Sequence, residues 1–478
     1  MIDRRDILDM ASQMSLTPHV VEKDYVLGWM LAGIASHPIL RETWVFKGGT
    51  CLKKCYFETY RFSEDLDFTL TDPDQINEEF LKTAFAEIGG WIYEQTGIEV
   101  PPEKQKFDIY KNPRGTISCE GKIKYRGPVS PRDMPGIKLD LTADERLVLP
   151  PVRVPVFHPY TDTPEQGIDV LSYAYEEVFG EKIRALGERT RPRDLYDVVN
   201  LFRNDDARPS SSVLLDVLRQ KCEFKGINVP TLADLEPHRQ ELMGLWDNML
   251  AHQLPVLPPY ESFWDELPSF FDGINGGATP AIPVAYANDG SETVLRARNL
   301  RLPVSGAAQT MIEIVRFAAA NRLCVDLEYK KLDGSTSRPR IEAYSLRRTA
   351  DGNILLHGHD VNQNGPRSYR IERIQSARVT NQTFVPKYEI ELTPKGPVSV
   401  APSPARATSS AFRAQPVTRA RAAPRKKASS SYFAKPTHTY QCPMCSKKFK
   451  REKYDAKLNP HKNQWGQPCS GRTGFLVS

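Results

Sequence analysis

The stretch FKGGTCLKKCYFETYRFSEDLDF, residues 46–68, decides the fold of the N-terminal part of this chain. The apolar run 44–46 that leads into it predicts a short strand. The adjacent Gly48 and Gly49 predict a tight turn, because glycine has no side chain to obstruct one. The next residues, CLKKCYF, predict a short helix, and the run LDFTL (66–70) predicts a second strand. The stretch therefore predicts a strand–turn–helix–strand unit that holds a bare backbone turn beside a cluster of carboxylates.

The glycine turn is a candidate phosphate cradle. If Gly48, Gly49 and Thr50 lead from the strand into the helix, their backbone N–H groups and the helix N-terminus point at one place. Such a place suits a phosphate, and Lys53, one turn further along, can reach the same anion. A glycine pair before a helix is often only a tight packing site, so the turn alone does not establish binding.

Asp65 and Asp67 are a candidate metal-binding pair. They are two residues apart in an extended run, so their side chains emerge on the same face of a strand. Two carboxylates held this close repel each other unless a cation lies between them, and hard oxygen ligands favour magnesium or manganese. Asp-x-Asp pairs are common on strands. Here, however, a phosphate cradle and a metal pair complement each other, since the metal can bridge a triphosphate to a reacting hydroxyl.

The combination resembles the core motif of the nucleotidyltransferase superfamily, G-[GS]-[TS] followed by D-x-D. More closely, it is similar to the AbiEii/AbiGii-type toxin nucleotidyltransferases, whose signature runs K-G-G-T-x-L and then R-F-S-E-D-[LI]-D-F. The matching positions are Lys47, Gly48, Gly49, Thr50, Leu52 and the unbroken run 61–68. The resemblance implies an α/β (α+β) nucleotidyltransferase core with a helical subdomain, and metal-dependent transfer of a nucleoside monophosphate from an NTP.

The resemblance also implies a third carboxylate. In GIKLDL (136–141), Lys138 and Asp140 share a strand face by their period of two. Asp140 stands where the family carries its third metal ligand, which with Asp65 and Asp67 would complete a two-metal site for magnesium. Asp144, outside that strand, is the weaker candidate.

A further segment, EKIRALGERTRPRDLYDVVNL (181–201), resembles the family's K-x-x-A…R-x-x-R-D-x-Y-D pattern. Phosphoryl transfer needs cations on the triphosphate, and Lys182 is the best side chain for that catalytic role. The resemblance places Arg193 and Asp194 among the substrate-binding residues, with Asp194 orienting Lys182 or an arginine. Without the family context, Arg193 and Asp194 can also be a surface ion pair near a helix start.

Composition along the chain predicts the domain boundaries. The nucleotidyltransferase domain that the resemblance implies is expected to span residues 1–272, with a core to about 205 and a helical subdomain over 206–272. Two helices of the core are separated at Pro192. Residues 273–306 are rich in Gly, Pro and Ala and predict a linker. Residues 307–392 predict one helix and then short strands, which are typical of a small β-barrel.

Residues 307–392 resemble a WYL domain, the small SH3-like barrel found in many bacterial regulators. The resemblance lies in LEYKKLDGSTSRPRIEAYSLRRTADGNILLHGHD (327–360) followed by RSYRIERIQSARV (367–379). The chain departs from the eponymous triplet, because Ile354-Leu355-Leu356 stands where W-Y-L is expected. Arginines of this sheet can line a site for nucleotide or single-stranded nucleic acid, although solvation of a polar strand face explains them equally. They are Arg340, Arg347, Arg367, Arg370 and Arg373.

Residues 439–478 predict a small module stapled by zinc. Cys442 and Cys445 form a C-x-x-C knuckle, and His461 and Cys469 follow. Four such ligands make a closed tetrahedral site, which is structural rather than catalytic. The spacing departs from the usual finger, so the fourth ligand is less well defined than the first two. So short a segment cannot bury a core without a staple.

Basic residues surround this module. Residues 393–438 are rich in Pro, Ala, Ser and Arg and predict a disordered linker, and residues 401–440 carry eight Lys or Arg and no acid. More basic residues follow the knuckle: Lys447, Lys448, Lys450, Arg451 and Lys453. Both groups indicate a polyanionic partner such as nucleic acid, or else a solvated surface.

Bulk composition sets further limits. A length of 478 residues suggests roughly three domains, and 40% hydrophobic with 26% charged residues is typical of a soluble protein. No apolar run has the length of a membrane span, and the N-terminus lacks the apolar core of a signal peptide. The eight scattered cysteines do not suggest a disulfide framework. A cytoplasmic location is therefore expected.

The leading hypothesis is a toxin nucleotidyltransferase. The resemblance makes RNA, especially a tRNA 3′ end, the most plausible acceptor, with toxin–antitoxin function or phage defence as the output and a cognate antitoxin as a further partner. The alternative is a non-catalytic regulator that senses nucleotide and binds nucleic acid. The full set of Asp65, Asp67, Asp140 and Lys182 disfavours it, since a binding fold does not need all of them. An antibiotic-modifying nucleotidyltransferase is a third, weaker hypothesis, because it does not explain the nucleic-acid modules.

Overall fold

The computed structural model describes two compact units, Met1–Arg406 and Ala407–Ser478. The described residues are 2–57, 60–129, 134–204, 208–277, 307–348, 353–392, 438–442, 444–445, 447–451, 457–459, 461–462, 468–470, 473 and 475–476. The predicted linker 273–306 lies outside them from residue 278 to 306, and the predicted basic linker 393–438 lies outside them except for its last residue. Within the described ranges, no helix combines the length and the apolar character needed to cross a membrane.

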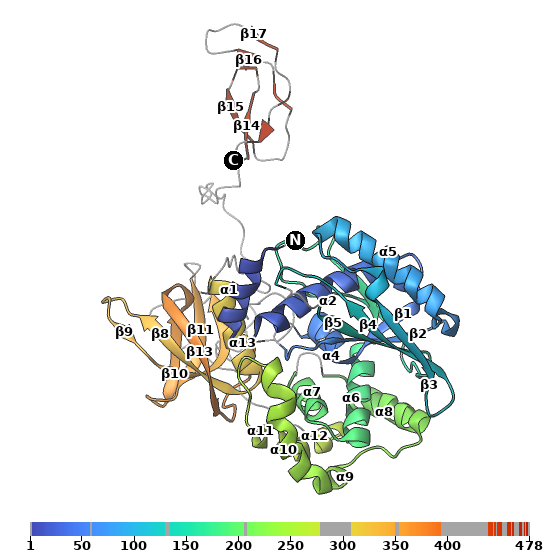
Figure 1. Ribbon diagram of the computed structural model, residues 1–478. Coiled ribbons are helices and arrows are strands. Elements are labelled where there is room, and N and C mark those ends of the chain that lie inside the picture. Colours follow the sequence, from blue (N-terminus) through green and yellow to red (C-terminus); the bar gives the residue numbers. More distant parts are fainter. Residues whose placement is uncertain are drawn as a thin grey trace, which may run out of the picture. The chain divides into compact units, whose positions relative to one another are not determined.

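Helices make up much of the first unit (Figure 1). Helix α6 ends at Arg189, Thr190 takes a left-handed conformation, and α7 begins at Pro192, where the missing N–H of proline is harmless. The predicted break at Pro192 is thus confirmed. The helices are α1 (Arg4–Met14), α2 (Pro18–Ser36), α3 (Leu40–Thr43), α4 (Gly48–Cys51), α5 (Glu78–Thr96), α6 (Tyr175–Arg189), α7 (Pro192–Arg203), α8 (Ser211–Lys225), α9 (Leu232–Leu235), α10 (Arg239–Leu250), α11 (Glu261–Trp264), α12 (Leu267–Ile274) and α13 (Ala307–Ala320).

A mixed sheet forms the centre of the N-terminal domain (Figure 1). Among the described residues its strands are, in spatial order, β3 (Lys106–Lys111), β4 (Ile117–Lys124), β5 (Gly136–Thr142), β2 (Asp65–Leu70), β1 (Trp44–Lys47), β7 (Asp169–Ser172) and β6 (Val152–Pro155). Strand β2 runs parallel to β5 and antiparallel to β1. The predicted α/β core is confirmed, including the strand–turn–helix–strand unit formed by β1, α4 and β2.

The two faces of this sheet have different roles. One face is apolar and is covered by α5, whose Phe85 packs against Trp44 and Phe107. Alternate positions along each strand point to the other face, and these include Asp65 and Asp67 of β2. The sheet therefore has one face that packs into the apolar core and an opposite face that carries charged side chains.

The predicted helical subdomain is made of α8 to α12. Helices α10, α11 and α12 of this subdomain pack against α7 (Figure 1). The contact is aromatic: Phe263 of α11 stacks on Tyr196 of α7 and also meets Trp246 of α10. The subdomain thus packs against and stabilises α7, whose N-terminal turn carries Arg193 and Asp194.

A second sheet follows α13, which packs on β8, β10 and β13. It is antiparallel and runs in the order β12, β11, β10, β8, β13, with β9 added to β8. The bounds are β8 (Leu323–Lys330), β9 (Thr336–Ser337), β10 (Arg340–Arg348), β11 (Ile354–Asp360), β12 (Gly365–Arg370) and β13 (Ile374–Thr383). The sheet curls into a half-barrel around α13 (Figure 1), which agrees with the predicted small β domain.

The second unit contains short strands. Strand β14 (His438–Gln441) pairs with β15 (Lys448–Arg451) and β18 (Phe475–Leu476), and β16 (His461–Lys462) pairs with β17 (Pro468–Cys469). The described buried side chains here are few, namely Tyr440, Cys442, Leu458 and Cys469. So small a core agrees with the expectation that the module needs a staple.

Candidate active site

Three carboxylates lie close together where β2 meets β5. Asp67 is directly opposite Asp140 across the parallel pair, and Asp65 is opposite Lys138 on the same face. Burial and the neighbouring Asp140 carboxylate raise the pKa of Asp67 to about 6, and the same two causes raise the pKa of Asp65. Crowding of like charges opposes ionisation, and a hard divalent cation removes that opposition. The donor set therefore fits magnesium or manganese.

The glycine turn fits closely around one of these carboxylates. Gly48 has φ +81°, a conformation that side chains other than glycine rarely adopt. A Cβ atom at Gly48 would also lie 2.1 Å from Oδ2 of Asp67. At Gly49 it would lie 2.8 Å from Nη2 of Arg61. Both glycines are thus required by close approach, and Gly48 by backbone conformation as well.

The start of the helix leaves its N–H groups without a side-chain cap. Lys47 precedes α4 in an extended conformation and its side chain makes no capping hydrogen bond. The Thr50 hydroxyl points elsewhere, because it donates to the backbone carbonyl of Asp65 and ties the turn to β2. A phosphate cradle at this turn would consequently rely on backbone N–H groups, with Thr50 holding the cradle in place.

Asp197 is buried and holds both Arg61 and Lys182; we call these three residues the clasp. The clasp joins the signature run 61–68 to the segment 181–201. Asp197 of α7 accepts two hydrogen bonds from Arg61, from Nε at 2.7 Å and from Nη2 at 2.8 Å, and lies 2.7 Å from Nζ of Lys182. It also accepts one from the Tyr60 hydroxyl. Burial alone would raise the pKa of Asp197, but Arg61 and Lys182 hold it well below its usual range. The clasp fixes Lys182 on the side of the sheet where its charge lowers the pKa of Asp67.

Asp194 and Arg193 are neighbours with different surroundings. Asp194 is fully buried, accepts two hydrogen bonds from Arg189, and lies 3.7 Å from Nζ of Lys182. It therefore positions cations and has no exposed surface for a substrate. Arg193 donates to the Met249 carbonyl and has no carboxylate partner within 4.0 Å among the described residues. Burial and Arg61 lower the pKa of Arg193. Its half-buried guanidinium is thus suited to an incoming anion.

Two sequence candidates lie elsewhere. Lys53 is buried, with its ammonium over the rings of Phe62 and Phe157, because α4 passes into a π-turn over Leu52–Tyr56. Asp144, the weaker candidate for the third carboxylate, is held by Asn112 and Arg114 at the turn between β3 and β4. Asp144 is therefore engaged in fixing that turn.

Sequence reasoning gave no role to several residues near the carboxylates. Lys47 is opposite Asp67 across β1 and β2, and its charge lowers the pKa of Asp67. Lys47 directly precedes the glycine turn. Because it is opposite Asp67, its side chain lies on the same face of the sheet. Arg61 and Asp197 were quoted within motifs, but nothing in their spacing shows that they pair.

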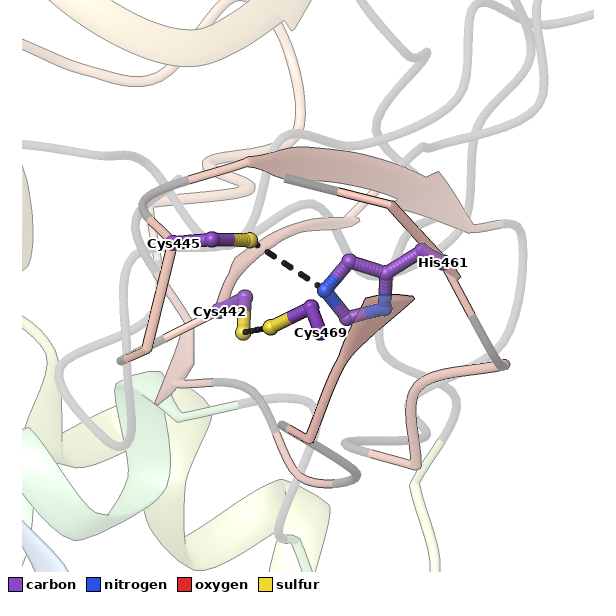
Figure 2. Close-up of side chains that lie close together, drawn as sticks. All are labelled: Cys442, Cys445, His461 and Cys469. Carbon is purple, nitrogen blue, oxygen red and sulfur yellow. Dashed lines mark hydrogen bonds between the residues drawn. The ribbon is translucent and has the colours of Figure 1, made fainter. Parts of the chain in front are cut away.

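The predicted zinc ligands come together in the second unit, as Figure 2 shows. Ligand atoms of Cys442, Cys445, His461 and Cys469 all lie within 4.8 Å of one another. Sγ of Cys442 is 3.8 Å from Sγ of Cys469, and Sγ of Cys445 is 3.3 Å from Nε2 of His461. His461 and Cys469 are opposite each other across β16 and β17. Three thiols and one imidazole are a donor set that suits zinc.

Two of the predicted arginines of the second sheet are paired with carboxylates. Arg347 is fully buried and its guanidinium is held by Glu391. Arg340 makes two hydrogen bonds to Asp326. The suggestion that these two line a nucleic-acid site is therefore not supported, because their charges are already neutralised within the fold.

Comparison with known protein families defines the class. The family model described as nucleotidyl transferase AbiEii toxin, type IV TA system, matches residues 29–272, just over half of the chain. A WYL domain model matches residues 310–379. The chain therefore belongs to the AbiEii nucleotidyltransferase toxin family, is a nucleotidyltransferase, and carries a WYL domain.

Solved structures give distant similarities. MenT4, a nucleotidyltransferase toxin of Mycobacterium tuberculosis, is 15% identical with a TM-score of 0.36, and the match covers 58% of this chain and 91% of that one. Proteasome accessory factor B/C of Arthrobacter aurescens is 15% identical with a TM-score of 0.16 over 43% of this chain and 32% of that one. The present chain thus spans about a third of the accessory factor's length. A search of curated protein sequences gives no significant match.

Proposed function

We propose that this toxin transfers a nucleoside monophosphate from an NTP to the 3′ end of an RNA, with tRNA as the most plausible acceptor and toxin–antitoxin function or phage defence as the output. The observation that carries the proposal is the alignment of Asp67 with Asp140 across β2 and β5, beside the Gly48 turn. A regulator that only binds nucleotide has no need for carboxylates crowded enough to raise the pKa of Asp67.

Asp65, Asp67 and Asp140 are the proposed ligands of magnesium. When bound, the metal would neutralise charge on the triphosphate and lower the pKa of the acceptor hydroxyl. The chain's own residues do the positioning. Asp67 is held against Gly48 at a separation that excludes any Cβ atom, and Thr50 ties the turn to the carbonyl of Asp65.

The triphosphate is proposed to lie between the glycine turn and α7. Backbone N–H groups of the turn would meet one phosphate, and Arg193 would bind another, since no carboxylate among the described residues lies within 4.0 Å of its guanidinium. Lys182, held by Asp197 and Asp194, would add positive charge as the pyrophosphate leaves. In this arrangement Asp194 is a positioning residue.

The second unit and the WYL domain are proposed to help recruit nucleic acid. Cys442, Cys445, His461 and Cys469 would hold a structural zinc ion that organises the second unit. The exposed Lys447 and Lys448, at the start of β15, would then contact nucleic acid. A cognate antitoxin is the expected protein partner, and the WYL domain is a further candidate for contact with nucleic acid.

The proposal is tested by incubating the protein with magnesium, total RNA and each NTP labelled at the α-phosphate. Wild-type protein is expected to label RNA, and Asp67→Asn to lower the rate by more than about 10²-fold. Asp169→Asn is the matched control, because Asp169 is an exposed carboxylate on β7 of the same sheet. If all four nucleotides bind and none is transferred to any RNA, the chain is a nucleotide-binding regulator and the proposal is wrong.

A further inference from the structure

The sheet face that carries the carboxylates continues across β5, β4 and β3 (Figure 1). Lys138 of β5 is opposite Lys122 of β4, which is opposite Lys106 of β3. We call these three residues the lysine row. It starts beside Asp65, because Asp65 is opposite Lys138. Residues aligned across neighbouring strands share a face, so the lysine row leads from the carboxylates to the edge of the sheet.

This face is exposed, and part of its positive charge is unpaired. Lys106 and Lys122 are exposed and have no carboxylate within 4.0 Å among the described residues. Lys138 instead lies 3.1 Å from Asp140 and 3.7 Å from Glu120. The outer two lysines are therefore available to a phosphate, while Lys138 can exchange its partner when Asp140 binds a cation.

An aromatic side chain lies on the same face, further along β3, with Asp108 between it and Lys106. Tyr110 of β3 is 46% exposed, and it shares the face because it is opposite Ser118, which is opposite Thr142. Burial and the charges of Glu120 and Asp140 raise the pKa of Tyr110, in keeping with its place beside them. An exposed aromatic ring on the same strand face as lysines is a combination on which proteins stack bases of single-stranded nucleic acid.

The topology separates this surface from the glycine turn. The turn follows β1, on one side of β2, whereas the lysine row begins at β5, on the other side. The metal-binding carboxylates of β2 and β5 lie between them. A triphosphate held by the turn and an acceptor lying on the lysine row would thus approach the carboxylates from opposite sides, as transfer between two substrates requires.

We infer that the lysine row and Tyr110 bind the 3′-terminal nucleotides of a single-stranded RNA acceptor. This inference rests on the proposed function. Neighbouring strands are about 4.8 Å apart, so the row extends roughly 10 Å and reaches more than one phosphate. Phosphates lie over Lys122 and Lys106, and a base stacks on Tyr110. Glu120 and Asp108 are opposite each other across β4 and β3, and their carboxylates accept hydrogen bonds from ribose hydroxyls.

The first test does not depend on transfer. RNA whose 3′ ribose has been oxidised with periodate carries two aldehydes, which form Schiff bases with nearby lysines and are fixed by borohydride reduction. This RNA cannot accept a nucleotide. Mass spectrometry of the full chain is expected to find the adduct on Lys138, Lys122 or Lys106. Adducts confined to lysines outside the row overturn the inference, whereas adducts on the row without any transfer to native RNA would count against the proposed function alone.

The second test reverses charge on the row. The double variant Lys106→Glu and Lys122→Glu is expected to raise KM for RNA roughly tenfold at low salt, and to reduce the slope of log affinity against log salt by about 0.7 for each lysine. Affinity for a fluorescent NTP should stay unchanged. The control is Lys82→Glu, an exposed lysine of α5 on the opposite face. The inference fails if the double variant, with its melting temperature intact, matches the control in KM and slope.

Discussion

Replacing Gly48 by alanine tests whether the turn is shaped around a catalytic carboxylate. Alanine at φ +81° costs about 1–2 kcal/mol, which lowers the melting temperature by roughly 2–8 °C in a domain of this size. The new Cβ atom would also lie 2.1 Å from Oδ2 of Asp67, where ordinary contact begins at 3.4 Å. The carboxylate must therefore move by more than about 1 Å. A displacement of that size is expected to lower the rate of nucleotide transfer about 10²-fold.

Gly115→Ala is the matched control for this prediction. Gly115 also has φ +81°, but an added Cβ atom would meet no atom within 4 Å. Both variants lose the same backbone freedom in the unfolded chain, so that contribution cancels between them. Calorimetry should show a fall in melting temperature for both variants, and the transfer assay should show a loss of rate only for Gly48→Ala. Equal rates for the two variants at a temperature where both are folded would refute the argument that Gly48 makes room for Asp67.

Three further predictions concern stability and metal content. Burial and Lys54 lower the pKa of His158 to about 3, below its ordinary value of 6.5, so the unfolded state binds more protons between these values. Stability should rise with pH from about 3 to about 6.5, and His158→Phe should flatten the melting-temperature profile; an unchanged profile would contradict this. Asp197→Asn takes the carboxylate from the buried Arg61 and leaves Lys182 only the more distant Asp194, so it should cost about 3–5 kcal/mol in urea unfolding, whereas an unchanged midpoint would show that the clasp is dispensable. Native mass spectrometry should find one zinc ion, which is lost when Cys442 and Cys445 are changed to serine and kept in Cys222→Ser; zinc retained in the double variant would disprove the assignment.

Local patterns in the sequence predicted the parts of the site that are close in the chain. The glycine turn and the shared face of Asp65 and Asp67 follow from backbone conformation and from the period of two along a strand. The four cysteine and histidine ligands follow in the same way from spacing and chemistry, since few arrangements other than a metal site bring three thiols and an imidazole together.

Long-range pairing could not be predicted in this way. Nothing local to β5 states that it lies beside β2, so Asp140 was found by family resemblance and its alignment with Asp67 by structure. The link from Arg61 to Asp197 spans 136 positions, and either residue alone looks like an ordinary surface charge. Lys53 shows the opposite problem: its position one turn into a helix suggested that it can reach the anion of the glycine turn, but its ammonium lies in the interior over the Phe62 ring.

The second sheet shows how tertiary contacts override composition. Five arginines there suggested a basic surface, yet the segment after β13 returns Glu391 to the buried Arg347. A local pattern describes which side chains share a face, but it does not reveal which segment later covers that face. Among the described residues, exposed lysines without a carboxylate within 4.0 Å instead include Lys106 and Lys122, on strands to which no function was assigned.

The clasp of Arg61 by Asp197 has a consequence for a toxin during its synthesis. Arg61 lies against Gly49 of the glycine turn, and it has no Asp197 carboxylate to pair with until α7 has been made. A nascent or truncated chain that stops before residue 197 therefore has the signature motif but lacks the partner that holds it in shape. Fragments from premature termination or early proteolysis would thus lack the pairing that holds the signature motif.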